Sequence, residues 1–200
     1  MLLLLLCSSC DRSPIERVAQ SQPLSPLPNL ATVLQADKVE IQNDWNGHSD
    51  ITPVLRRYKL RLDKQKLVGN AHIAVGGYGA AGIHQQKTTK INIPAATSAK
   101  FLATLAKTPL QTGTYQPRID RGDDYPSITI QLQIARQQVT FSSQSQSVGN
   151  VPWKVTITKN DRTVEYISNS AFPAQALKSL DPYLDKNGIE LIIQRRRQKK

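Results

Sequence analysis

The stretch VLRRYKLRL, residues 54–62, decides the fold class of this chain. From Arg57 onward, cationic and apolar side chains alternate strictly. Because successive side chains of a strand point to opposite faces, this period of two predicts a half-buried strand with one apolar and one cationic face. A turn at Asp63–Lys66 and a returning strand from Leu67 to Val75 complete a predicted β-hairpin.

The same alternation predicts more strands later in the chain. Ser127–Ile134 alternates Ile and Leu with Thr and Gln, and 138–142 pairs back to it through a short turn. Two further strands are expected at 153–158 and 163–167, joined by the turn 159–162. These runs predict an antiparallel sheet.

Two helices accompany the predicted strands. One runs from about Ala96 to Lys107, with Phe101, Leu102 and Leu105 on one face, Thr97 or Ser98 as its N-cap, and Pro109 ending it. The other covers Ala174–Leu184, where Pro182 kinks or restarts it. The expected fold class is therefore α+β, a mostly antiparallel β-sheet with two packed helices, preceded by a disordered tether.

The net charge of +11 is concentrated at one end of the 200-residue chain. Five cations lie in the last six residues, which leaves +6, the difference between 11 and 5, for the rest. A net charge of that size is common on the surfaces of soluble proteins. Nucleic-acid binding would also need aromatic side chains among the cations, and Tyr58 faces away from the cations beside it, so a nucleic-acid partner is not expected. The tail is either a solvated end or a membrane-surface contact made by Arg195, Arg196, Arg197, Lys199 and Lys200.

The opening MLLLLLCSSC, residues 1–10, resembles a bacterial lipoprotein signal. Leu6, Ser8, Ser9 and Cys10 match its pattern, which implies cleavage before Cys10 and lipidation of Cys10. Cys7 and the lack of basic residues before the leucines depart from the pattern, and an earlier start would explain them. The competing reading is a redox or metal-binding CxxC pair, for which no helix start or second ligand pair lies nearby.

The resemblance divides the chain into four parts. Residues 1–9 are a truncated signal peptide, 10–37 the lipidated Cys10 and a Pro/Ser/Gln-rich tether, 38–194 a single α+β domain, and 195–200 the basic tail. A short helix at Leu30–Gln35, capped by Asn29, is the alternative for the end of the tether. The expected location is the bacterial cell envelope, and the resemblance adds that Asp11, directly after the cysteine, favours the periplasmic face of the inner membrane.

No sequence motif assigns a catalytic residue, a metal or a cofactor. Gly77–Gly82 spells GxGxxG, but no amphipathic helix follows it, so a hairpin loop is expected there. HExxH and GxSxG are absent, and the three histidines are scattered. The alternative to a structural turn around Asn46-Gly47 is a cation-binding or hydrolase-like cluster of Asp44, His48 and Asp50.

Several segments along the chain resemble a family of small uncharacterised bacterial lipoproteins of cyanobacterial type. They are Trp45-Asn46-Gly47 through Tyr58, Asp123–Ser127, Pro152-Trp153 and Pro173–Leu177. The resemblance implies a location and no activity. The expected function is a lipid-anchored, non-enzymatic module that binds an envelope partner or ligand through its sheet. The aromatic residues to test for exposure on that surface are Trp45, Tyr115, Tyr125 and Trp153. The alternative function is an enzyme that uses Asp44, His48 and Asp50.

Overall fold

The computed structural model describes residues 27–45, 54–76, 83–118, 126–145 and 148–184. The strands are β1 Lys38–Trp45, β2 Val54–Asp63, β3 Lys66–Gly76, β4 Ile83–Ile93, β5 Pro126–Ile134, β6 Gln137–Ser143, β7 Trp153–Lys159 and β8 Arg162–Ser168. The helices are η1 Leu30–Gln35, α1 Ala95–Leu105, η3 Val148–Asn150, α2 Phe172–Lys178 and α3 Asp181–Leu184.

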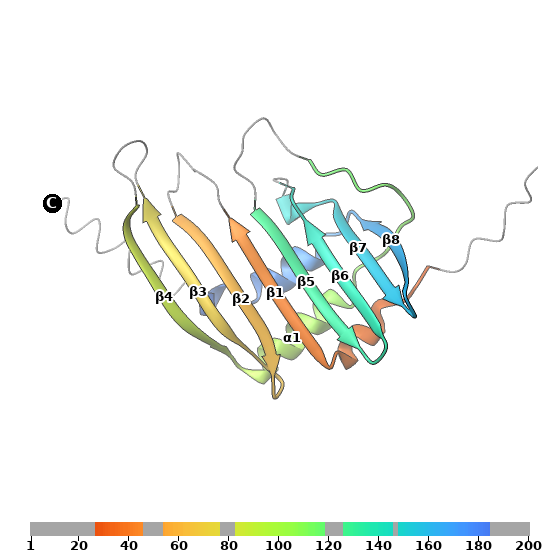
Figure 1. The fold of residues 1–200 in the computed structure, drawn as a ribbon, viewed down its shortest axis with the longest axis horizontal. Coiled ribbons are helices and arrows are strands. Elements are labelled where there is room, and N and C mark those ends of the chain that lie inside the picture. The colour runs from red at the N-terminus through yellow and green to blue at the C-terminus, as the bar shows by residue number, and fades with distance from the viewer. Residues whose placement is uncertain (1–26, 46–53, 77–82, 119–125, 146–147, 185–200) are drawn as a thin grey trace, which may run out of the picture.

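The strands form one eight-stranded sheet in the order β4-β3-β2-β1-β5-β6-β7-β8, and every neighbouring pair is antiparallel (Figure 1). Two four-stranded meanders, β1–β4 and β5–β8, thus meet through β1 and β5, and a helix follows each meander. The predicted α+β fold class is confirmed.

The hairpin that decided the fold class forms as predicted from β2 and β3. Tyr58 and Leu60 are buried, whereas Lys59 and Arg61 are exposed. The turn between the strands is made by Lys64 and Gln65, whose φ angles of 45° and 68° match the twist of antiparallel strands.

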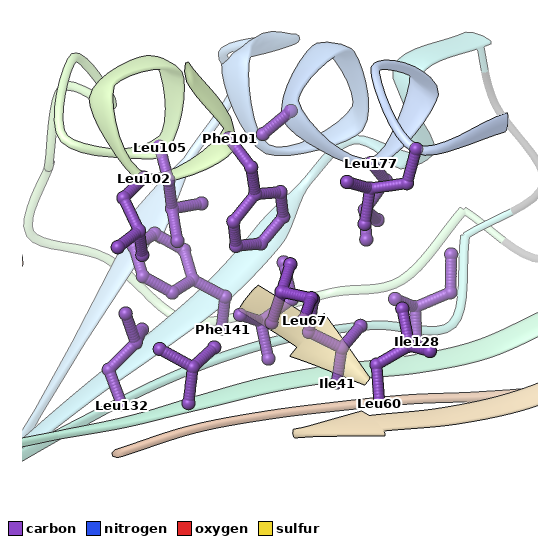
Figure 2. Close-up of a cluster of buried hydrophobic side chains, with 14 of the residues drawn as sticks. Ile41, Leu60, Leu67, Phe101, Leu102, Leu105, Ile128, Leu132, Phe141 and Leu177 are labelled. Atoms are coloured by element: carbon purple, nitrogen blue, oxygen red, sulfur yellow. The ribbon is translucent and has the colours of Figure 1, made fainter. Parts of the chain in front are cut away.

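All described helices that pack on the sheet lie on the same side of it, behind the strands in Figure 1. Figure 2 shows the resulting core, with helix side chains pointing at strand side chains. Phe101 and Leu105 are fully buried against Leu60, Leu132 and Phe141, which are fully buried as well. The opposite side of the sheet carries no described helix.

Part of the segment predicted as a tether is structured immediately before β1. The alternative short helix is present as η1, and Asn29 caps it by accepting a hydrogen bond from the Ala31 amide at 2.8 Å. Leu30 and Val33 are buried in the core, and the Asp37 carboxylate accepts a bond from the Ala135 amide at 2.9 Å. The prediction of a disordered tether is therefore wrong for residues 30–37, because two apolar side chains of η1 fill the core.

The predicted helices are corrected in detail. α1 begins at Ala95 after Pro94, with no side-chain cap, so neither Thr97 nor Ser98 is the N-cap. Ser98 is instead buried inside the helix, where its hydroxyl accepts from the Leu67 amide and donates to the Pro94 carbonyl. The second predicted helix is two pieces, α2 and α3, and Pro182 lies in the first turn of the restart, as expected.

The two ends of the sheet differ in how their strands are connected. Two-residue turns join β2 to β3, β5 to β6 and β7 to β8, all at one end, which we call the turn end. Longer connections join β1 to β2, β3 to β4 and β6 to β7 at the opposite end. The predicted turn at Asn46-Gly47 and the predicted loop at Gly77–Gly82 lie outside the described residues.

Gly69 of β3 is expected to tolerate no side chain. A Cβ there would lie 2.0 Å from the carbonyl oxygen of Lys59 in the backbone of β2, so Gly69→Ala must push the two strands apart. We expect it to lower the free energy of unfolding by about 1–3 kcal/mol, measured by urea denaturation. Asn70→Ala, at the exposed neighbouring position, is the control. Equal midpoints for the two variants would contradict the strand packing.

Candidate binding surface

The side of the sheet away from the helices forms one continuous polar surface, which we call the open face. Its residues follow from strand alternation and from the register, which places Lys59 between Gln42 of β1 and Asn70 of β3, with Lys90 of β4 beyond Asn70. These side chains are exposed, as expected opposite a helix-covered core. The open face divides into two halves of different chemistry.

The basic half lies on β2, β3 and β4. Its exposed cations are Arg57, Lys59 and Arg61 of β2, Lys66 of β3 and Lys90 of β4, and the exposed Asp63 of β2 lies opposite Lys66. Alternate residues of a strand are about 6.6–6.8 Å apart, and β2 and β4 are separated by about 9.6 Å. Arg57, Lys59, Arg61 and Lys90 therefore lie within a few strand spacings of one another on the twisted sheet.

The neutral half lies on β5, β6 and β7. Its register rows place Gln131 beside Thr140 and Thr156, and Thr129 beside Ser142. These hydroxyl and amide side chains are half-buried by their neighbours and face away from the helices. Near its outer edge Lys154 and Glu165 form an ion pair at 2.5 Å, which at this exposure is worth about 0–1 kcal/mol.

Acidic side chains mark the border between the halves, on β1. Glu40 lies directly opposite Arg61 in the β1–β2 register, and Asp44 accepts a hydrogen bond from the side-chain amide of Gln42. Lys38 adds a cation on the same face at the start of β1, so the two carboxylates lower the positive potential along the rest of this strand. An anionic partner would consequently meet the sheet first over the basic half.

The structure describes only some of the candidate site residues named from the sequence. Asp44 ends up on the open face, whereas His48 and Asp50 lie outside the described residues, as do Cys10 and the five cations of the tail. His72 is a surface histidine, with its Nδ1 atom 3.0 Å from the Thr88 hydroxyl. Among the described residues no group of three or more His, Cys, Asp or Glu could hold a metal ion.

Neither of the two aromatic candidates whose side chains are described, Tyr115 and Trp153, is exposed. Trp153 is fully buried, which corrects the expectation of exposure, and its indole nitrogen donates to the Gly149 carbonyl at 2.9 Å. Tyr115 is half-buried, and its hydroxyl accepts from the Gln144 amide at 3.0 Å. The side chains of Trp45 and Tyr125 lie outside the described ones. No Phe, Tyr or Trp occurs among the described side chains of the open face.

The covered face also has a polar row, near the end of the longer connections. Register places Asn43, Tyr58, Ala71 and Thr89 side by side across four strands. The side-chain oxygens of Asn43 and Thr89 are buried and have no hydrogen-bond partner within the described part of the chain. The apolar core thus becomes polar toward this end of the sheet.

Sequence reasoning predicted several strands of the open face but not their order in the sheet. The alternating cations of β2 gave a clear signal, but Lys90 joins them only because β4 lies two strands away in the sheet. The neutral half is likewise assembled from three strands whose neighbours the alternation does not specify. Strand order is the information that the sequence pattern lacked.

Comparison of the chain with protein-family models, with curated proteins and with solved structures gives no match. No helix in the described part of the chain is both long and apolar enough to cross a membrane. Function must therefore be argued from the surface itself.

The exposure of the basic half predicts that its charges are dispensable for folding. We expect the triple variant Lys59→Gln/Arg61→Gln/Lys90→Gln to keep the free energy of unfolding within about 0.5 kcal/mol per substitution of the parent value. Urea denaturation measures it. A larger loss would show that these cations hold the sheet together, which would contradict their assignment to a free binding surface.

Proposed function

We propose that this protein is a lipid-anchored, non-enzymatic module of the bacterial envelope that binds an acidic polysaccharide through its open face. The observation that carries the proposal is the chemistry of that face, a group of exposed cations on β2, β3 and β4 beside a half rich in hydroxyl and amide groups. The lipid anchor rests on the sequence alone.

Residues 6–10 support the anchor, with Cys10 as its site. In the pathway that this signal resembles, membrane phospholipid donates the lipid and the bond before the cysteine is hydrolysed. Sixteen residues, 11–26, separate Cys10 from Leu27, where the described fold begins. A flexible chain of that length has a mean reach of about 20–25 Å, which keeps the domain close to the membrane and to the polymers next to it.

The two halves of the open face fit different groups of one polymer. The basic half matches repeated carboxylates or phosphates, which charge-assisted hydrogen bonds hold most strongly. The neutral half matches the hydroxyl groups of sugars, which both donate and accept hydrogen bonds as Thr, Ser and Gln do. An acidic polysaccharide presents both chemistries along one chain.

Nucleic acid fits the open face less well. Single strands are held by aromatic side chains that stack on the bases, and the described side chains of this face include no Phe, Tyr or Trp. The cationic tail at 195–200 remains a predicted membrane-surface contact. The enzyme built on Asp44, His48 and Asp50 also stays a prediction.

The anchor is tested by mass spectrometry of the protein extracted from membranes. We expect a mature N-terminus at Cys10 that carries lipid, and loss of labelled palmitate incorporation in Cys10→Ala. Recovery of unlipidated chain from the soluble fraction, or labelling that survives the substitution, would overturn the anchor and leave the binding surface to be judged separately.

Binding is tested with the soluble Cys10→Ala chain and alginate, a polymer of acidic sugars, by isothermal titration calorimetry. We expect saturable binding that weakens as salt increases, because oppositely charged groups are screened. Lys59→Gln/Arg61→Gln/Lys90→Gln should reduce affinity at least tenfold.

The matched control is Lys100→Gln/Lys107→Gln/Lys178→Gln, which removes the same charge from exposed positions on the helix side. It should bind alginate as the parent does. Equal losses in both triple variants would mean attraction by net charge alone, and tighter binding to phosphatidylglycerol vesicles than to alginate would replace the polysaccharide with a membrane surface.

A further inference from the structure

A groove lies at the turn end of the molecule, away from the open face. Its volume is about 480 Å³, and its walls come from η1, from the end of β2 and the turn that follows it, and from the first half of α1. η1 and α1 are seen together at the lower end of the sheet in Figure 1. Its apolar lining consists of Leu34, Ala36, Leu62, Ala95, Ala99 and Leu102.

The groove exists because small residues occupy the wall formed by α1. Ala95 and Ala99 are one helical turn apart, and neither reaches across to η1. Leu34 on the opposite wall is consequently 55% exposed, and Leu27, where the described chain begins, is 50% exposed. Two large apolar side chains thus lie uncovered along the path by which the chain enters the fold.

The polar groups of the groove offer little to a polar ligand. Ser98 is the buried one, and its hydroxyl already accepts from the Leu67 amide at 3.0 Å and donates to the Pro94 carbonyl at 3.1 Å. The remaining two, Gln35 and Gln65, are exposed at the surface. A peptide segment would bring an amide and a carbonyl per residue that need partners, whereas an alkyl chain needs none.

We propose that this groove holds a fatty acyl chain, and that the chain is the protein's own, attached at Cys10. The inference rests on the proposed lipid anchor. The length of the intervening segment supports it, since a flexible chain of sixteen residues, the number between Cys10 and Leu27, spans a mean distance of about 20–25 Å. One wall of the groove, η1, begins three residues after Leu27.

Occupation of the groove would control how the domain is held at the membrane. With an acyl chain in the groove, fewer chains insert in the bilayer and the turn end lies close to the lipidated residue. With the groove empty, the domain is free on its tether. A methylene group has apolar surroundings both in the groove and in the bilayer. The free energy of moving the acyl chain between them is therefore small, and the two states can interconvert.

The experiment feeds cells with palmitate that carries a terminal diazirine, irradiates the membranes and maps cross-links in the purified full-length protein. We expect cross-links that join the Cys10 peptide to peptides of η1 or α1, including Leu34 or Leu102. Ala99→Trp fills the groove and should reduce these cross-links at least tenfold. Lys100→Trp places the same side chain at an exposed position on the side of α1 away from the groove, and should leave them unchanged.

The outcomes separate this inference from the anchor. Incorporation of the probe at Cys10 with cross-links only to lipid, or equal cross-linking in Ala99→Trp and Lys100→Trp, overturns the groove as the acyl site and leaves the anchor standing. Failure to incorporate the probe at Cys10 overturns the anchor, and with it the claim that the acyl chain is the protein's own.

Discussion

The pairing of β1 with β5 is the interaction on which the rest of the structure depends. It joins the two meanders into one sheet, with Ile41 opposite Ile130 and Val39 opposite Leu132, and these four side chains are almost completely buried. The bonds that Asp37 makes with the β5–β6 hairpin extend the pairing beyond the strands. Because the sheet is continuous, the helices following the two meanders can share one core on one face, and no described helix covers the other face.

That asymmetry explains the two surface features that carry the functional proposals. The open face exists because the described helices pack on the opposite side of the sheet. The cations of β2 and β4 lie near one another on it because β3 pairs with both strands. The groove exists because η1, ahead of β1, meets α1 at the turn end but leaves Ala95 and Ala99 uncovered. Both features are consequences of how the elements are ordered, and each lies where no core side chain is needed.

Sequence alternation predicted the hairpins well and the central strand poorly. β2 and β5 were recognisable because their apolar positions alternate without interruption, while β1 has Asn43 on its covered face and only Val39 and Ile41 before it. Prolines and polar residues dominate the segment before β1 and predict a tether, although Leu30 and Val33 of this segment are buried in the core. The N-cap was misplaced because Ser98 satisfies the β3 backbone instead of the helix start. In each case a tertiary contact outweighed the local signal.

The central claim is that a one-sided sheet uses its uncovered basic half to bind an acidic polymer. The most direct test is to titrate the isotopically labelled Cys10→Ala chain with alginate oligosaccharides and follow backbone amide resonances. The account predicts chemical-shift changes concentrated on β2, β3 and β4 and extending to β1 and β5, with α1 and α2 unchanged. Changes confined to the helices, or spread evenly over the molecule, would contradict it.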